Sequence, residues 1–220
     1  MKRQRTEQLQ RSVAIEVTYA SLHACISEQR PGGELQVSTE SVTWRNASVS
    51  LDSDTGLQEI TAAFKQLASS LKLYNQTVQI SLSGDFCVTR VVTGKSDEVR
   101  QQLHELEERS SSYFLLGHGP KTFGRCIREV DAKQQHALLS IVNQRVPTRV
   151  MDAANRAGMK VDVVEPSIVG SCRLLGFLGG DVDEPALVIQ VGQRTVELGV
   201  CHRGQLLLDY RPSGHDAKTS

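Results

Sequence analysis

Alternating apolar and polar residues dominate the first part of the chain. Segments of this kind cover 12–17, 22–26 and 34–44, and the turn-forming residues Arg30-Pro-Gly-Gly33 precede the third. Period-two alternation is typical of a half-buried β-strand, and proline and glycine favour a reversal of the chain. The pattern therefore predicts three consecutive strands joined by hairpins.

A helical pattern follows this group of strands. Between Asp54 and Tyr74 the apolar residues recur at helical spacing, which predicts an amphipathic helix with Asp54 or Thr55 as its N-terminal cap. The apolar positions are Leu57, Ile60, Phe64, Leu67 and Leu71. Two further segments, 77–83 and 86–92, predict strands that complete the first half of the domain.

Helices and strands alternate in the middle of the chain. We expect a charged helix at 97–109, strands at 122–130 and 135–142, a helix at 147–157, a strand at 159–164 and a helix at 165–178. Pro147 suits the first turn of its helix because the N–H that proline lacks has no helical partner there. Gly158 suits the position just beyond the end of that helix. Helix 97–109 either docks a partner or, more simply, presents a solvated charged face.

Three short β-rich runs follow at 186–191, 195–201 and 205–210. Gly192-Gln193-Arg194 and His202-Arg203-Gly204 separate them, and each break is short and contains glycine. This spacing predicts an antiparallel three-stranded meander. The first run is apolar almost throughout, which is typical of a strand covered on both faces, so a buried sheet is expected.

Composition limits the classes of function. Lysine plus arginine and aspartate plus glutamate number 25 each, so no net charge attracts nucleic acid or an anionic membrane surface. No segment approaches the roughly eighteen apolar residues of a membrane-spanning helix, so we expect a cytoplasmic protein without direct membrane insertion. The cysteines are odd in number and lie among apolar neighbours, which predicts reduced core thiols. They are Cys25, Cys87, Cys126, Cys172 and Cys201.

The terminal meander carries a resemblance to a known family. Its apolar strand, its glycine-bearing turn and its Thr195-Val-Glu-Leu198 strand, followed by Arg211-Pro-Ser-Gly-His-Asp216, resemble the second phosphate-binding hairpin of the actin-like ATPase superfamily. Within it the chain is most similar to the PilM family of type IV pilus assembly. The stretch 146–178 resembles the end of the inserted subdomain in PilM and in its division relative FtsA. The resemblance implies an α/β actin-like, ribonuclease H-like fold with a mixed sheet.

The same resemblance predicts how the chain divides. It assigns 12–92 to the first part of the actin-like subdomain, 93–164 to a small inserted α/β subdomain, 165–185 to a return helix and linker, and 186–220 to the start of a second lobe. That lobe is expected to be incomplete, so the sequence is interpreted as a C-terminally truncated fragment. The polar residues 1–11 are expected, from their composition, to be a flexible N-terminus.

The two expected phosphate turns depart from the family pattern. At the first, Glu16 replaces aspartate, Thr18 replaces glycine and Tyr19 follows, before the small hydroxyl residue Ser21. Glycine there lets backbone N–H groups approach phosphates, so this turn is a poor cradle.

At the second turn Gly192 and Thr195 remain, but Gln190 stands at the acidic position near the metal and supplies no charge to magnesium. ATP and magnesium are therefore implied by the resemblance and disfavoured by these residues, and no catalytic residue or metal ligand is assigned. The simpler interpretation is that these are strand-end and turn residues.

The resemblance also implies the function. We expect a scaffold of type IV pilus assembly or a related secretion machine, peripheral at the inner membrane. It binds the short cytoplasmic tail of a membrane protein such as PilN, between the inserted and main subdomains, does not bind nucleic acid, and is compatible with a homo-oligomer. The alternatives are an active ATP-dependent enzyme of the sugar-kinase type and an FtsA-like cell-division scaffold.

Overall fold

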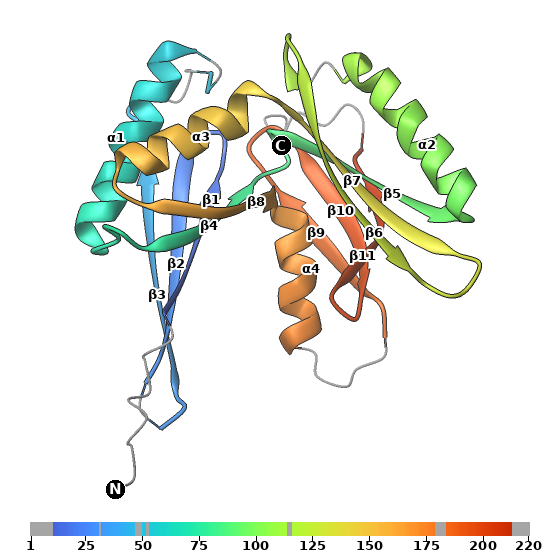
Figure 1. The fold of residues 1–220 in the computed structure, drawn as a ribbon. Coiled ribbons are helices and arrows are strands. Elements are labelled where there is room, and N and C mark those ends of the chain that lie inside the picture. The colour runs from blue at the N-terminus through green and yellow to red at the C-terminus, as the bar shows by residue number, and fades with distance from the viewer. Residues whose placement is uncertain are drawn as a thin grey trace, which may run out of the picture.

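The computed structural model describes residues 11–30, 32–46, 50–51, 53–113, 116–178 and 184–212. Within these residues the strands form three sheets, one with five strands and two with three strands each. Figure 1 shows the five-stranded sheet in one half of the molecule and the two smaller sheets in the other. The molecule is therefore a mixed α/β structure, as the sequence predicts.

The five-stranded sheet has the order β3-β2-β1-β4-β8. Its strands are β1 (Arg11–Val17), β2 (Ser21–Gln29), β3 (Leu35–Thr43), β4 (Thr77–Leu82) and β8 (Lys160–Pro166). The first three are antiparallel neighbours, β4 is parallel to β1, and β8 is parallel to β4. The predicted meander is confirmed, and the alternation that predicted it places Val13, Ile15 and Val17 in the core.

Helices α1 (Asp54–Ser70) and α3 (Arg145–Arg156) lie side by side on this sheet. Ile60, Phe64 and Leu67 of α1 are completely buried, which confirms the helix that their spacing predicts. Its N-terminal cap is Ser53, not Asp54 or Thr55, because the Ser53 Oγ accepts from the Gly56 N–H at 3.0 Å. In α3 Pro147 does lie in the first turn, and Gly158 follows the helix with a φ of +82°.

The second sheet has the order β5-β7-β6 and is covered by helix α2. Its strands are β5 (Cys87–Gly94), β6 (Lys121–Glu129) and β7 (Gln135–Asn143), and α2 (Ser96–Glu108) continues into a short 3-10 turn, η1 (Arg109–Ser112). We expected β5 to belong with 12–92, but it pairs with β7 along its whole length. The limits of the inserted subdomain stay a proposal, and the strand pairing favours 87–143 over 93–164.

The third sheet, β11-β10-β9, is the predicted C-terminal meander. It consists of β9 (Ala186–Val191), β10 (Val196–His202) and β11 (Gln205–Tyr210). The expectation that its first strand is buried on both faces is wrong: Leu187, Ile189 and Val191 are 62%, 57% and 73% exposed. Only the side that carries Val188 packs, because the described residues place α4 (Ser167–Leu178) on that side and no element on the other.

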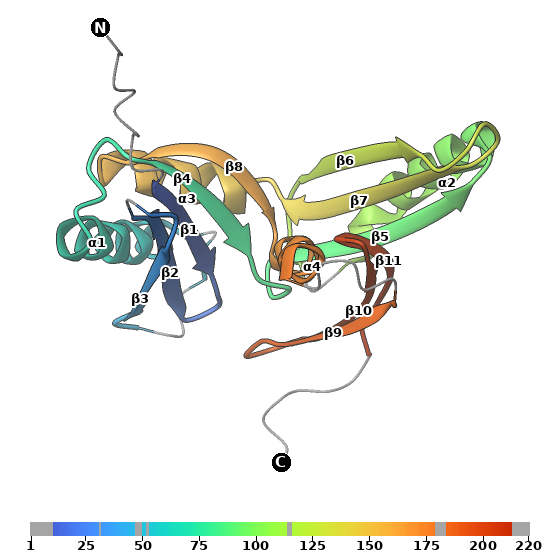
Figure 2. The same cartoon turned by 90° about the horizontal axis from the view of Figure 1, so that it is seen from below.

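Helix α4 holds the three sheets together. Seen end-on in Figure 2, it lies where β8, the inserted sheet and the C-terminal sheet meet. It contacts β4 and β8 of the first sheet and all three strands of the third. Ile168 and Cys172 of α4 are fully buried against Val188, Cys201 and Leu206.

The cysteines follow the prediction only in part. Cys87, Cys172 and Cys201 are buried free thiols, whereas Cys25 and Cys126 are exposed on strands. Burial, followed by the neighbouring Cys201 thiol, raises the pKa of Cys172 to about 12, so this sulfur stays protonated. Among the described helices, none is long and apolar enough to cross a membrane.

Candidate functional site

Most of the predicted phosphate-turn residues meet in one cleft. Glu16 and Thr18 at the end of β1 face Gln190, Gly192 and Thr195 across a cavity of about 310 Å³. The cleft forms because the β9–β10 hairpin points toward the end of β1 (Figure 2). Ser21 does not line it but lies buried behind the first turn.

The first turn is occupied by its own hydrogen bonds. The Thr18 N–H donates to the Ser21 carbonyl at 2.9 Å, and the two hydroxyl oxygens lie 2.7 Å apart. The Ser21 hydroxyl also contacts His23 Nε2 at 2.8 Å, and His23 Nδ1 contacts the Ser41 hydroxyl at 2.7 Å. These polar groups form a closed chain within the described residues, so the turn is stable without a ligand.

The second turn is held by Asp85, a residue that the sequence analysis did not single out. Its Oδ1 accepts from the Arg194 N–H at 3.1 Å and from the Thr195 hydroxyl at 3.2 Å. Asp85 is 6% exposed and follows β4 in the loop Ser83-Gly84-Asp85. A carboxylate of the chain itself thus takes the donors that would bind an anionic ligand. Its position after a parallel strand was the available signal, since polar residues at the carboxyl ends of such strands often line sites.

Gln190 is fixed by helix α4. Its Oε1 accepts from the Ser167 hydroxyl at 2.9 Å, and its Nε2 donates to the Ser171 hydroxyl at 2.8 Å. Both ends of the neutral amide are therefore engaged, and the side chain brings no charge into the cleft. The Gly192 N–H is also engaged within the chain, because it donates to the Thr195 carbonyl at 2.8 Å.

The electrostatics of the cleft disfavour phosphate. Glu16 and Glu197 line it, and none of the described lining residues is a lysine or an arginine. Glu197 is 6% exposed and pairs with Arg211 at 2.5 Å. Burial raises the pKa of Glu197, and the Arg211 charge offsets this rise only in part.

The two turns also contact each other. The Arg194 guanidinium of the second turn stacks over the Tyr19 ring of the first, 4.8 Å from the ring centre.

The residues therefore do not fit a magnesium–nucleotide complex. The donors of the second turn are engaged by Asp85, and the carboxylates at hand are Glu16 and the Arg211-paired Glu197. In the described part of the chain no three acidic, histidine or cysteine side chains gather as metal ligands. We derive no phosphoryl-transfer step for this cleft.

A second hollow lies on the other side of α4 and is larger, about 490 Å³. Its floor is the face of the β6–β7 pair that α2 leaves uncovered. Its walls come from β8, α4 and the β10–β11 turn. We call it the groove, and its lining includes Gly124, Cys126, Arg128, Leu138, Val142, Val163, Pro166, Val169, Arg173 and Leu206.

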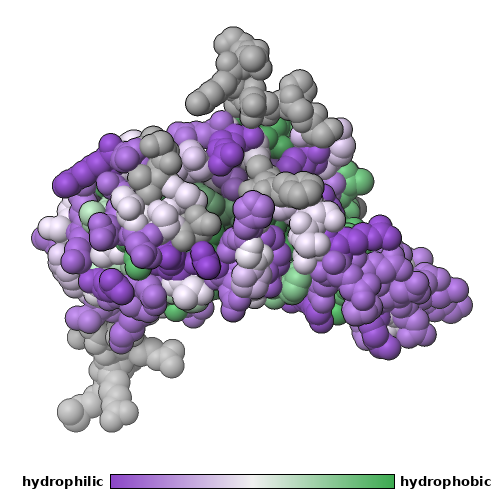
Figure 3. Space-filling view, turned by 90° about the horizontal axis from the view of Figure 1, so that it is seen from above, coloured by the Kyte–Doolittle hydropathy of each residue, from purple (hydrophilic) through white to green (hydrophobic). Residues whose placement is uncertain are grey.

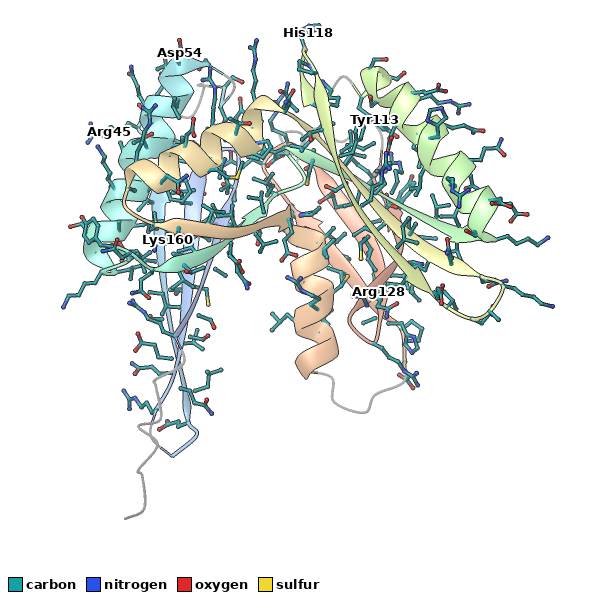
Figure 4. The ribbon with its side chains drawn as sticks, in the orientation of Figure 1. Arg45, Asp54, Tyr113, His118, Arg128 and Lys160 are labelled. Atoms are coloured by element: carbon teal, nitrogen blue, oxygen red, sulfur yellow. The ribbon has the colours of Figure 1, made fainter. Side chains whose placement is uncertain are left out.

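The groove is mainly apolar, and two of the three arginines that line it are paired with carboxylates. Arg125 pairs with Glu107 at 2.5 Å, and Arg173 pairs with Glu165. Arg128 has no ion pair with any described residue, and Figure 4 places it on the side of β6 that faces α4. Seen from above, the surface is mostly hydrophilic, with hydrophobic colour in small scattered areas (Figure 3).

Contacts across the chain fix the groove wall that the C-terminal sheet supplies. The His136 Nε2 of β7 lies 2.9 Å from the Leu206 carbonyl and donates to it. The Arg90 guanidinium pairs with Asp209 at 2.8 Å, and the Val91 N–H donates to the same carboxylate at 2.9 Å. These contacts, between β5 or β7 and β11, link the inserted sheet to the C-terminal sheet.

Solved structures resemble this arrangement. A PilM-PilN type IV pilus biogenesis complex matches with a TM-score of 0.69 at 13% identity, over 94% of this chain and 62% of that one. The cytoplasmic domain of EpsL, an inner-membrane component of the type II secretion system of Vibrio cholerae, matches with a TM-score of 0.52 at 11% identity, over 92% of this chain and 71% of that one. No protein-family model and no curated protein sequence matches the chain.

These likenesses show the fold class of the protein. The chain has the α/β actin-like fold that the sequence resemblance implied. One solved structure with this fold is the PilM-PilN complex, and at 13% identity the likeness concerns the fold alone. The chain spans about three fifths of the length of that PilM chain.

Proposed function

We propose that this protein is a scaffold that binds a short peptide from an inner-membrane partner in the groove between its inserted and main sheets. It works in the cytoplasm, is peripheral at the membrane through that partner, and belongs to a pilus assembly or related secretion machine. The partner is a PilN-like protein that contributes its cytoplasmic tail.

The uncovered floor of the groove carries this proposal. Leu138 of β7 and Val163 of β8 are only partly buried, and together with Val142 of β7 they line a hollow of about 490 Å³. Concave, mostly apolar hollows with a few polar groups are typical of ligand sites. The likeness to a PilM-PilN complex supports a PilN-like partner as the occupant.

The state of the cleft supports a scaffold over an ATP-dependent enzyme. Thr195 and the Thr18–Ser21 turn are hydrogen-bonded within the described residues, and the acidic residues that line the cleft are Glu16 and Glu197. We therefore propose that ATP and magnesium are not needed for partner binding.

The exposed cysteines provide a direct test. Cys126 lies in the groove, whereas Cys25 lies on β2 outside it. Two single-label proteins, Cys25→Ser and Cys126→Ser, are each alkylated with a bulky maleimide. Fluorescence anisotropy then measures binding of synthetic peptides that cover the cytoplasmic segments of the inner-membrane proteins encoded beside this chain.

We expect one of these peptides to bind the unmodified protein. Alkylation of Cys126 should abolish that binding, because the adduct fills the groove, and alkylation of Cys25 should leave it unchanged. If no peptide binds, or if the Cys126 adduct has no effect, the proposal is wrong.

A further inference from the structure

Strand β6 is an open edge of its sheet. The order β5-β7-β6 leaves one side of β6 without a described strand beside it. The Gln144 N–H donates to the Pro120 carbonyl and the Val130 N–H to the Gln134 carbonyl, and the β6–β7 register is continuous between these pairs. Even-numbered residues of β6 therefore bond to β7, and odd-numbered ones such as Phe123 and Ile127 direct their N–H and C=O groups outward.

The side chains of β6 divide in the same way. Thr122, Gly124, Cys126 and Arg128 lie on the groove side with the even-numbered residues of β7. The odd-numbered side chains face α2, as the ion pair between Arg125 and Glu107 shows. A strand added beside β6 would thus direct alternate side chains toward the groove.

The charge on the rim selects among such strands. Arg125 and Arg173 are neutralised by their own partners, whereas Arg128 is exposed and unpaired among the described residues. Arg128 lies opposite His136, at the far end of the floor from Thr122. A carboxylate would complement this end, since a guanidinium pairs best with planar anions.

Gly124 leaves the middle of the floor open. A Cβ at this position would meet only the Ser140 Cβ, at 3.7 Å, which is ordinary contact, so the fold itself does not require glycine here. The missing side chain leaves room for a large apolar side chain of a ligand.

We propose that the ligand binds as an added fourth strand along the outer edge of β6. It carries alternate apolar side chains directed into the groove over Gly124 and a carboxylate paired with Arg128. This inference rests on the proposed function, because it states how the same groove recognises its peptide. Main-chain pairing supplies affinity, and alternate side chains supply specificity.

The main test uses backbone methylation. The probe is a synthetic peptide as long as the nine-residue β6, in which valine or leucine alternates with threonine and one aspartate is moved along the sequence. Single N-methyl groups are then placed at each position of the peptide that binds best. An added strand bonds through every second residue, so methylation should weaken binding about tenfold at alternate positions and little at those between.

Paired variants of the protein repeat the test from the other side. Ile127→Pro removes an outward N–H that β7 does not use, and Ile127→Ala loses the same side chain but keeps the N–H. We expect the proline variant to bind about tenfold more weakly than the alanine variant. Arg128→Glu should weaken the aspartate peptide and strengthen the same peptide with lysine in place of aspartate.

The outcomes separate this inference from the proposed function. If the peptide binds and the Cys126 adduct blocks it, but N-methylation shows no alternation, strand addition is wrong and peptide binding in the groove stands. If charge reversal at Arg128 has no effect, the carboxylate is wrong. If neither these probes nor the neighbouring membrane segments bind, both proposals fail. Should Ile127→Pro not fold, the methylated peptides still decide.

Discussion

The cleft and the groove lie on opposite sides of α4 and differ in how their surfaces are satisfied. In the cleft, Asp85 is hydrogen-bonded to the second turn, Gln190 to two serines of α4, and the first turn within itself. In the groove, the outer edge of β6 has no described strand beside it, Arg128 has no ion pair with a described residue, and apolar side chains of β7 and β8 line the hollow. Ligand sites are recognised by unsatisfied groups as much as by shape, so the comparison favours the groove even though the resemblance first drew attention to the cleft.

The largest effect should come from filling the groove. Gly124→Leu places a side chain on its floor with no close backbone contact, so peptide affinity should fall at least about a hundredfold, or about 3 kcal/mol. Titration by fluorescence anisotropy measures the affinity, and thermal unfolding checks that the fold is intact. The matched control in the cleft, Gln190→Ala, should leave peptide affinity unchanged. A full-affinity Gly124→Leu protein would place the peptide elsewhere.

The next effect tests whether the cleft is a structural element. Asp85→Ala leaves the Arg194 N–H and the buried Thr195 hydroxyl without their acceptor, which should lower the free energy of unfolding by about 1–3 kcal/mol. Urea unfolding measures this loss. Asp97→Ala removes an aspartate whose side chain is 96% exposed and should change stability by less than about 0.5 kcal/mol. Equal effects of the two substitutions would contradict the role given to Asp85.

A smaller effect is expected in the pH dependence of stability. Burial raises the pKa values of Glu197 and Asp209, and their arginine partners offset this only in part. The folded protein thus holds these protons more tightly than the unfolded chain. The stabilisation is complete below the unfolded pKa values and is lost as the pH rises through the folded ones.

Glu197→Gln should therefore flatten the decline of the unfolding free energy as the pH rises from about 4.5. Urea titrations at successive pH values measure it, and Asp209→Asn should change the slope in the same direction. A steeper decline in either variant would mean that the ion pairs outweigh burial.

The smallest effect is expected from nucleotide. Millimolar ATP with magnesium should leave the thermal midpoint where sodium chloride of equal ionic strength leaves it, because Glu16 and Glu197 face the cavity and Asp85 engages the turn. A saturable rise of the midpoint with ATP would show that the cleft opens to a nucleotide.

Much of the fold could be predicted because local pattern and burial agree. Alternation gave β1 to β3, and helical spacing gave the buried stripe of α1. Proline and glycine placed the limits of α3 to within a few residues. The membership of β5 could not be predicted, because alternation is the same whichever sheet a strand joins.

The site was predicted less completely. The resemblance predicted that Glu16 of β1 and Gln190 of β9 belong to one site, and in the structure both line the same cleft. Asp85 was missed because its contacts with Arg194 and Thr195 span more than a hundred residues. The exposure of Ile189 was missed because an apolar run indicates a strand suited to burial but does not reveal whether another layer covers it.

That uncovered side of the third sheet has a practical consequence. Leu187, Ile189 and Val191 of β9 and Leu208 and Tyr210 of β11 are all more than half exposed. An exposed hydrophobic patch of this kind promotes aggregation at high protein concentration. Purified protein is therefore best kept at low concentration. The substitution Ile189→Lys should reduce aggregation, because it adds a charge to this patch and lies outside the groove.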